Sequence, residues 1–140
     1  METYIAFTSE PIVSPAAGSA GREIGAELEF HGIVRETEHG AAIAGLQYEA
    51  YVPMAEREIA RIIAGLNTQW PCETVWFIHR IGWVPVGEPS LYIRIRSSHR
   101  QQAFHFCMAL IDQLKTDAPI WKRAALPENI SQPGRSPLDS

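Results

Sequence analysis

The only two lysines of this chain, Lys115 and Lys122, lie within one short segment, whereas its other ten cationic residues are arginines. A lysine amine can lose its proton when it is removed from water and can then act as a base or a nucleophile, but a guanidinium cannot. A compositional preference for arginine would explain why lysines are few, but not why both fall so close together. We therefore interpret the pair as candidate catalytic residues.

Other cationic side chains stand at the ends of predicted elements. Arg35 follows a strand, His99 and Arg100 stand at the start of a helix, and Lys115 lies at the end of that helix. Such ends are common places for binding sites, and a helix start also directs free N–H groups toward an anion. A purely structural explanation stays open for each residue, through helix capping, the helix dipole or ion pairs.

The remaining histidines and the cysteines do not suggest a metal site. Three histidines fall inside predicted strands or a predicted helix and are interpreted as structural: His31, His79 and His105. His39 falls in a loop, and its role stays open. Cys72 and Cys107 are far apart and lack metal-ligand spacing, so we expect buried thiols. We expect neither a metal nor a bound cofactor.

Composition excludes several classes of protein. The net charge of -4 argues against a general nucleic-acid binder, which needs a basic face to contact phosphates. No apolar run is long enough to cross a membrane, and the start METYIAFTSEPIV lacks the features of a secretory signal. There is no Gly-rich phosphate loop and no GxSxG motif. We expect a cytoplasmic protein that folds as a single catalytic domain over residues 1–140.

Alternating apolar residues predict the strands that would position these side chains. The pattern indicates a half-buried strand over residues 26–34, a second over 46–51, a third over 75–81 and a fourth over 90–97. The polar segment ETEHGAA between the first two reads as a mobile loop, and residues 82–89 read as a turn. Residues 1–24 and the tail 124–140 are expected to be irregular.

Two helices are predicted from apolar residues that recur every three or four positions. The first follows Pro53 and ends before Trp70-Pro71, with the apolar face Ile59, Ile62, Ile63 and Leu66. The second runs from about Arg100 to Thr116, with Ser97 or Ser98 as its N-cap. The order strand, strand, helix, strand, strand, helix predicts an α+β domain.

Four ordered segments are typical of one family: GIVRETEHG, LQYEAYVPMAE, FIHRIGWVPVGE and SSHRQQAFHFCMALIDQLKTDAPIWKR. Together they resemble the large, catalytic subunit of molybdopterin synthase. The resemblance covers residues 26–123. The ordered combination of IHRIG, SxHR and LKTxAPxWK is highly specific, although each piece alone is weak.

This resemblance implies an α/β hammerhead-type fold, in which a mixed sheet is covered by two main helices. It implies a homodimer that binds one small ubiquitin-like sulfur-carrier subunit at each end, which makes a heterotetramer. The small subunit would carry sulfur as a thiocarboxylate on its Gly-Gly C-terminus. Transfer of that sulfur to cyclic pyranopterin monophosphate would form the dithiolene of molybdopterin, a step of molybdenum cofactor biosynthesis.

Matched by motif, Lys115 and Lys122 correspond to the catalytic lysines of the family, and both also contact substrate. Arg35, His99 and Arg100 correspond to its anion-binding positions. The chain departs from the family pattern at Ala124, where many relatives have an acidic residue, and in its tail, where Arg135 cannot be aligned with the C-terminal arginine of relatives.

Two other functions fit parts of this pattern. A binding module could hold a ubiquitin-like Gly-Gly tail without catalysis, although the presence of both lysines argues against it. An unrelated small enzyme could act on another phosphorylated ligand, and it would need no Gly-Gly partner.

Overall fold

The first of two four-stranded sheets is mixed. A computed structural model describes residues 1–125 and 136–137, and the strands of this sheet lie in the order β1-β6-β8-β2. Their bounds are Glu2–Thr8 for β1, Thr74–Arg80 for β6, Pro89–Ser97 for β8 and Ala26–Ile33 for β2. β1 runs parallel to β6, whereas β6 and β2 each run antiparallel to β8.

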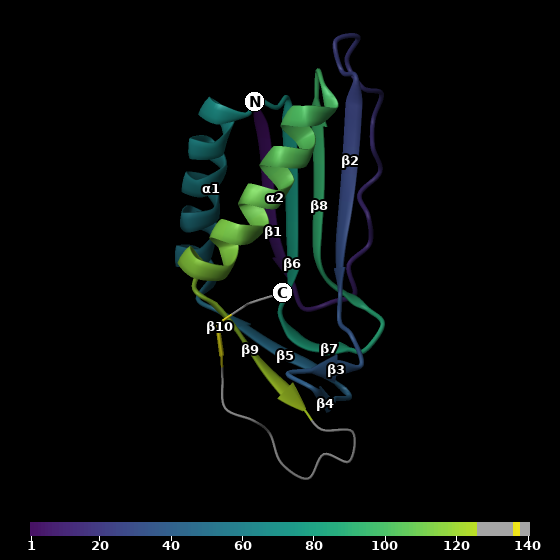
Figure 1. Ribbon diagram of the computed structural model, residues 1–140, viewed down its shortest axis with the longest axis vertical. Coiled ribbons are helices and arrows are strands. Elements are labelled where there is room, and N and C mark those ends of the chain that lie inside the picture. Colours follow the sequence, from purple (N-terminus) through teal and green to yellow (C-terminus); the bar gives the residue numbers. More distant parts are fainter. Residues whose placement is uncertain (126–135, 138–140) are drawn as a thin grey trace.

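Two helices, α1 (Val52–Gln69) and α2 (Arg100–Asp117), cover one face of this sheet (Figure 1). The apolar face predicted for α1 is buried, and α2 buries its own set of residues: Ala103, Phe106, Cys107, Leu110 and Leu114. These side chains meet Phe77, Ile93 and Ile95 of the sheet in one hydrophobic core. Burial of such apolar surface is the main force that holds the layers together.

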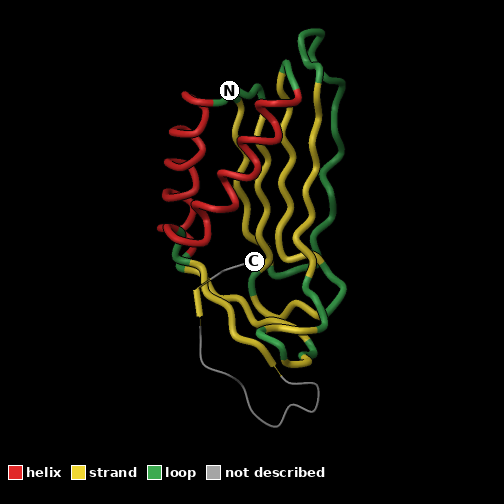
Figure 2. The backbone as a smooth tube through the Cα atoms, viewed as in Figure 1, coloured by secondary structure: helices red, strands yellow, loops and turns green. Residues whose placement is uncertain are grey.

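The second sheet is antiparallel, with the order β10-β9-β5-β7, and lies beyond the lower ends of the first-sheet strands in Figures 1 and 2. Its strands are β5 (Gly45–Ala50), β7 (Gly82–Pro85), β9 (Ile120–Ala125) and β10 (Ser136–Pro137). A short hairpin of β3 (Thr37–Glu38) and β4 (Ala41–Ala42) precedes β5. The second sheet therefore joins segments from the middle and the end of the chain.

The predicted α+β class, with a mixed sheet and two main helices, is confirmed. Several local predictions were wrong. The segment 1–24 contains β1, whose Ile5 and Phe7 pack against the core, so it is not irregular throughout. Residues 82–85 form β7 rather than part of a turn, because they pair with β5. The segment ETEHGAA, predicted to be a loop, contains the β3–β4 hairpin.

The ends of the second helix and of the chain also need correction. His99, not Ser97 or Ser98, is the N-cap of α2, and the Ser97 hydroxyl instead donates a hydrogen bond of 2.6 Å to the His99 carbonyl. The tail was predicted to be irregular from Ala124 onward, but Ala124 and Ala125 belong to β9, and residues 136–137 pair with it as β10. The rest of that tail, including Arg135, lies outside the described residues.

Candidate functional site

A cavity of about 400 Å³ lies where α2 ends between the two sheets. Its size falls in the range of small-molecule sites. The wall includes residues of strand β2, of the segment that follows it, of α2 and of β9. The polar and charged lining residues are His31, Arg35, Glu38, Tyr48, His79, Ser90, Lys115 and Lys122. Both candidate catalytic lysines therefore line one cavity together with Arg35.

Lys115 reaches this cavity from the last turn of α2. The helix ends two residues later, because Pro119 disfavours helical backbone at Ala118, which is extended with φ of -83° and ψ of 137°. The C-terminal end of a helix carries partial negative charge, which favours a cation in its last turn. The Lys115 side chain is half-buried, so it can meet both the cavity and solvent.

Lys122 enters the same cavity from β9 and is only 2% exposed. It lies opposite Tyr48 in the antiparallel register of β9 and β5, and Tyr48 is also buried. A buried ammonium group needs a partner of opposite charge, because the loss of its hydration shell costs on the order of several kcal/mol. That partner is Glu38, whose Oε2 lies 2.7 Å from Lys122 Nζ.

Arg35 stands at the mouth of the cavity. Its side chain is 75% exposed, and its Nη2 atom lies 3.9 Å from Glu38 Oε1. Glu38 therefore lies between one exposed and one buried cation. The sequence analysis did not identify Glu38, because the surrounding segment read as a loop. The His39-Gly40 pair could have indicated the hairpin that turns Glu38 toward the cavity.

His79 and Tyr48 form an aromatic wall of the cavity, and their ring centroids lie 5.0 Å apart in an edge-to-face arrangement. Burial lowers the pKa of His79 to about 4, and the nearby Arg80 carbonyl opposes this shift only in part. His79 is therefore neutral at pH 7, and its Nδ1–H donates to the Arg80 carbonyl at 2.7 Å. His79 was predicted to be structural, yet it also lines the candidate site.

His99 and Arg100 do not join the other predicted site residues within this chain. They stand at the start of α2, whereas Lys115 stands in its last turn. The helix has 18 residues, which corresponds to a length of about 27 Å. The sequence placed Arg35, His99, Arg100 and Lys115 at ends of elements, but only the structure shows which of these ends meet.

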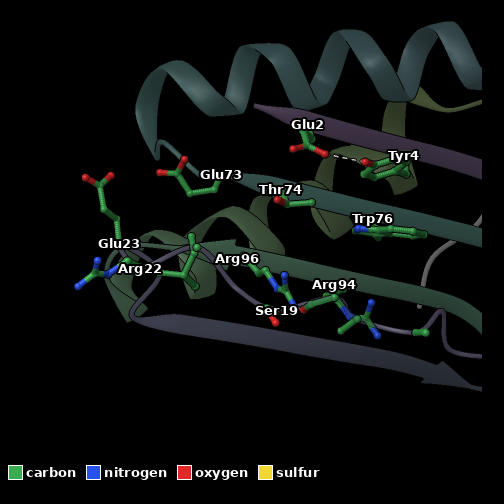
Figure 3. A pocket seen from close by; sticks show the side chains of 15 residues that line it. Glu2, Tyr4, Ser19, Arg22, Glu23, Glu73, Thr74, Trp76, Arg94 and Arg96 are labelled. Carbon is green, nitrogen blue, oxygen red and sulfur yellow. Dashed lines mark hydrogen bonds between the residues drawn. The ribbon is translucent and has the colours of Figure 1, made fainter.

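A larger cavity, of about 610 Å³, lies on the face of the first sheet opposite the helices (Figure 3). Two of the three arginines that line it, Arg94 and Arg96, are already hydrogen-bonded. Arg94 donates hydrogen bonds to the Pro15 carbonyl at 2.6 Å and to Glu29 at 3.4 Å, and Arg96 donates to the Gly18 carbonyl at 2.7 Å. These arginines hold the segment before β2 against the sheet. None of the predicted site residues lines this cavity.

Neither a metal site nor a reactive thiol is present in the described part of the chain. No group of three or more His, Cys, Asp or Glu residues within 1–125 could hold a metal ion. Both cysteines are buried and free, as predicted. Burial raises the pKa of Cys72 to about 12 and that of Cys107 to about 11. Both thiols are thus protonated at neutral pH. No described helix has the length and apolar character needed to span a bilayer.

Comparison with known families gives one match that covers most of the chain. Residues 7–117 match the model of the family described as MoaE protein. The matched segment includes strands of both sheets, both helices and Lys115, and it ends before Lys122.

Curated relatives extend the match. The molybdopterin synthase catalytic subunit of Salmonella typhimurium is 36% identical over 126 residues, which cover 84% of each chain. The human molybdopterin synthase catalytic subunit is 34% identical over 126 residues. This alignment covers 90% of the present chain and 63% of the human one. The chain spans between 55% and 63% of the length of the animal and plant relatives that it matches.

A solved structure agrees with the fold. The crystal structure of molybdopterin synthase from Staphylococcus aureus matches with a TM-score of 0.79 and 30% identity, and it covers 91% of this chain and 95% of that chain.

Proposed function

This chain belongs to the MoaE protein family, and from that premise we propose that it is the catalytic subunit of a molybdopterin synthase. One observation carries the proposal: Lys115 and Lys122, which come from different elements, line one cavity with Arg35. The candidate catalytic groups and a cation for an anionic substrate are therefore in one place, inside a chain whose net charge is negative.

The substrates we propose are a thiocarboxylate and a pterin phosphate. The first is the Gly-Gly C-terminus of a small ubiquitin-like sulfur-carrier subunit, and the second is cyclic pyranopterin monophosphate. Both are anions, so a cavity lined by cations supports their binding. In each transfer a C–S bond to the pterin replaces one of its C–O bonds, and at the carrier terminus a C–O bond replaces the C–S bond, so sulfur and oxygen are exchanged and the terminus ends as a carboxylate. Two transfers form the dithiolene.

The two lysines differ in burial, which supports a division of roles. Lys122 is held deep in the cavity by the sheet, so we assign it to fixing an anionic group of the tail or of the pterin. Lys115 is half-buried at a helix end, where it can approach the reacting carbonyl. We assign Lys115 to assisting the attack on the pterin and to stabilising the charge that develops on the thiocarboxylate carbonyl.

His99 and Arg100 fit this function only in an assembly. Since Arg100 lies about 22 Å along α2 from Lys115 of its own chain, we propose that His99 and Arg100 contact substrate in a pocket that includes a second copy. This agrees with a homodimer that binds one small subunit at each end. Light scattering tests it, because a folded monomer at micromolar concentration would contradict the shared pocket.

We also propose that the reaction takes place in the cytoplasm, within a chain that acts as a single catalytic domain. Both cysteines within the described residues are free thiols, which supports a reducing compartment. Expression with a fluorescent fusion and fractionation of the cells would test the location.

Reconstitution tests the activity. The chain is mixed with the thiocarboxylated small subunit and cyclic pyranopterin monophosphate, and molybdopterin is followed by the fluorescence of its oxidised derivative. We expect product from the wild type and from Arg57→Ala, an exposed cation on α1, but not from Lys115→Ala. If the wild type binds the Gly-Gly tail tightly but forms no product, the chain is a docking module rather than an enzyme.

A further inference from the structure

Glu38 occupies the position in the cavity that an anionic ligand would need. Its carboxylate lies 2.7 Å from Lys122 Nζ and 3.9 Å from Arg35 Nη2. The Glu38 side chain is 11% exposed and the Lys122 side chain is 2% exposed, so the pair is largely shielded from water. A second anion at Lys122 is repelled while Glu38 stays there, because two negative charges at one cation repel each other.

Glu38 is carried by a small element, the β3–β4 hairpin, which belongs to neither of the two four-stranded sheets. β3 and β4 have two residues each and pair Thr37 with Ala42 and Glu38 with Ala41, and one further hydrogen bond, from the Ile43 N–H to the Glu36 carbonyl at 2.9 Å, closes the open end of the hairpin. The turn between them has φ of 51° at His39 and 80° at Gly40, which is typical of a tight two-residue hairpin. Lys115 and Lys122, by contrast, come from an 18-residue helix and a six-residue strand.

We propose that Glu38 is an exchangeable counter-ion, which neutralises Lys122 in the empty cavity and is displaced when the anionic group of the ligand binds. The inference rests on the proposed function, which supplies two such groups, the C-terminal carboxylate of the tail and the phosphate of the pterin. Glu38 keeps the buried ammonium paired before the ligand arrives, and the ligand then replaces one ion pair by another. The β3–β4 hairpin turns the released carboxylate toward water.

This exchange makes Glu38 a determinant of ligand affinity that opposes binding. Replacement of its charge should therefore strengthen the binding of an anion at Lys122. A residue that only braces the site would have the opposite effect, because its loss would disorder the cavity. The direction of the change in affinity thus distinguishes the two roles.

The test compares Glu38→Gln with Glu36→Gln. Both remove one negative charge from the same segment, but Glu36 is exposed and does not line the cavity. Titration calorimetry measures the binding of two probes to each full-length variant: a peptide with a free Gly-Gly carboxyl end, and inorganic phosphate. The same peptide with an amidated end is the control for charge. We expect Glu38→Gln to bind at least one anionic probe about tenfold more tightly than the wild type, and Glu36→Gln to stay within about twofold.

The outcomes separate this inference from the proposed function. Tighter binding of the free peptide, but not of its amidated form, supports both. Tighter binding of phosphate alone supports the exchange of Glu38 but argues against a tail at Lys122. Equal or weaker binding of both anionic probes to Glu38→Gln overturns the exchange, whatever the chain catalyses. An equal gain in Glu36→Gln also overturns it, because a general charge effect would then be the cause.

If Glu38→Gln does not fold, a second variant, Gly40→Ala, tests the proposal. Gly40→Ala leaves both charges in place and has open space around the new methyl group, but it strains the turn at its φ of 80°. The hairpin is then easier to displace. We expect tighter binding of the anionic probes to Gly40→Ala, and unchanged or weaker binding would contradict the proposal.

Discussion

Lys122 of β9 lies directly opposite Tyr48 of β5 in the antiparallel register of the second sheet, and both side chains are 2% exposed. The sheet therefore fixes the position of Lys122, whereas Lys115 depends on the end of a helix. The two candidate catalytic lysines are held by different means, and they should respond differently to substitution.

Alanine in place of the two lysines should affect stability unequally. Lys122→Ala removes the partner of Glu38 and a buried aliphatic stem, so we expect the free energy of unfolding to fall by about 1–3 kcal/mol. Lys115→Ala should change it by less than about 0.5 kcal/mol, because the side chain is half-buried at a helix end. Urea denaturation of both variants measures the difference. Equal losses would show that the sheet does not set Lys122 apart.

The variant Lys115→Arg should show whether Lys115 acts through its positive charge or through proton transfer. Lys115→Arg keeps a cation in the cavity but removes the option of a neutral amine. If the amine takes part in proton transfer, the rate of sulfur transfer should fall by about 100-fold or more, while binding of the Gly-Gly peptide stays close to that of the wild type. Single-turnover kinetics together with calorimetry check this. Full activity of Lys115→Arg would indicate that Lys115 supplies charge alone.

His79 should make the fold sensitive to mild acid. Its folded pKa of about 4 lies below the ordinary value of 6.5, so between these values the unfolded chain takes up a proton that the folded chain does not. The free energy of unfolding therefore falls as the pH drops through this window, by about 2 kcal/mol from this residue between pH 7 and pH 5.

The variant His79→Phe keeps an aromatic ring but cannot take up a proton. We expect the difference in urea stability between pH 7 and pH 5 to be smaller in this variant than in the wild type. The same pH dependence in both proteins would mean that His79 is not the group responsible.

The two cysteines should not react in the folded protein. Burial keeps the thiols of Cys72 and Cys107 protonated, and a thiol reacts as its thiolate. We expect labelling with a maleimide or an aromatic disulfide at pH 7.5 to be slow in buffer and complete in denaturant. Rapid labelling of one cysteine in buffer would contradict this. Sulfur transfer should be unaffected by the reagent, because neither cysteine lines the candidate site.

Substitution of two glycines by alanine should change the free energy of unfolding in opposite directions. A Cβ atom at Gly45 would lie 2.5 Å from the Val84 carbonyl oxygen and 2.6 Å from the Trp83 ring, so Gly45→Ala should push β5 away from β7. We expect a loss of about 1–3 kcal/mol in the free energy of unfolding. Gly65 on α1 has open space around it, and Gly65→Ala should raise that free energy by about 0.5–1 kcal/mol. Thermal unfolding of the pair measures both effects.

The rate of sulfur transfer should also differ between Gly45→Ala and Gly65→Ala. Because β5 also pairs with β9, a shift at Gly45 should reach Lys122 and lower sulfur transfer. Gly65→Ala, on a helix away from the cavity, should keep wild-type activity. Equal activity in both variants would argue against β5 as the element that positions Lys122.

The helices and the long strands could be predicted because their signal is local. In α1, Ile59, Ile62, Ile63 and Leu66 recur at helical spacing, and they are buried as that spacing requires. β1 was missed although Ile5 and Phe7 alternate with polar or small neighbours. Its partner β6 lies about 70 residues further along the chain, and a short alternation does not reveal a partner at that distance.

The candidate site could be predicted only in its residue types. Lys115, Lys122 and Arg35 stood out by chemistry and by motif, and the structure brings them to one cavity. Glu38 did not stand out, because a glutamate in a polar segment is ordinary. Its contact with Lys122 depends on the β3–β4 hairpin and on the burial of Lys122 in β9. Neither can be predicted from the pattern of neighbouring residues in the sequence.

The sequence by itself determined the α+β class, the two helices and the cations that could bind an anion, since periodicity and residue chemistry act over a few neighbouring positions. Only the tertiary structure decided that Lys122 is buried against Glu38 and that it shares one cavity with Lys115 and Arg35. The physical reason is that strand pairing joins segments as distant as β5 and β9, and which side chains then share a cavity depends on that pairing rather than on their spacing along the chain.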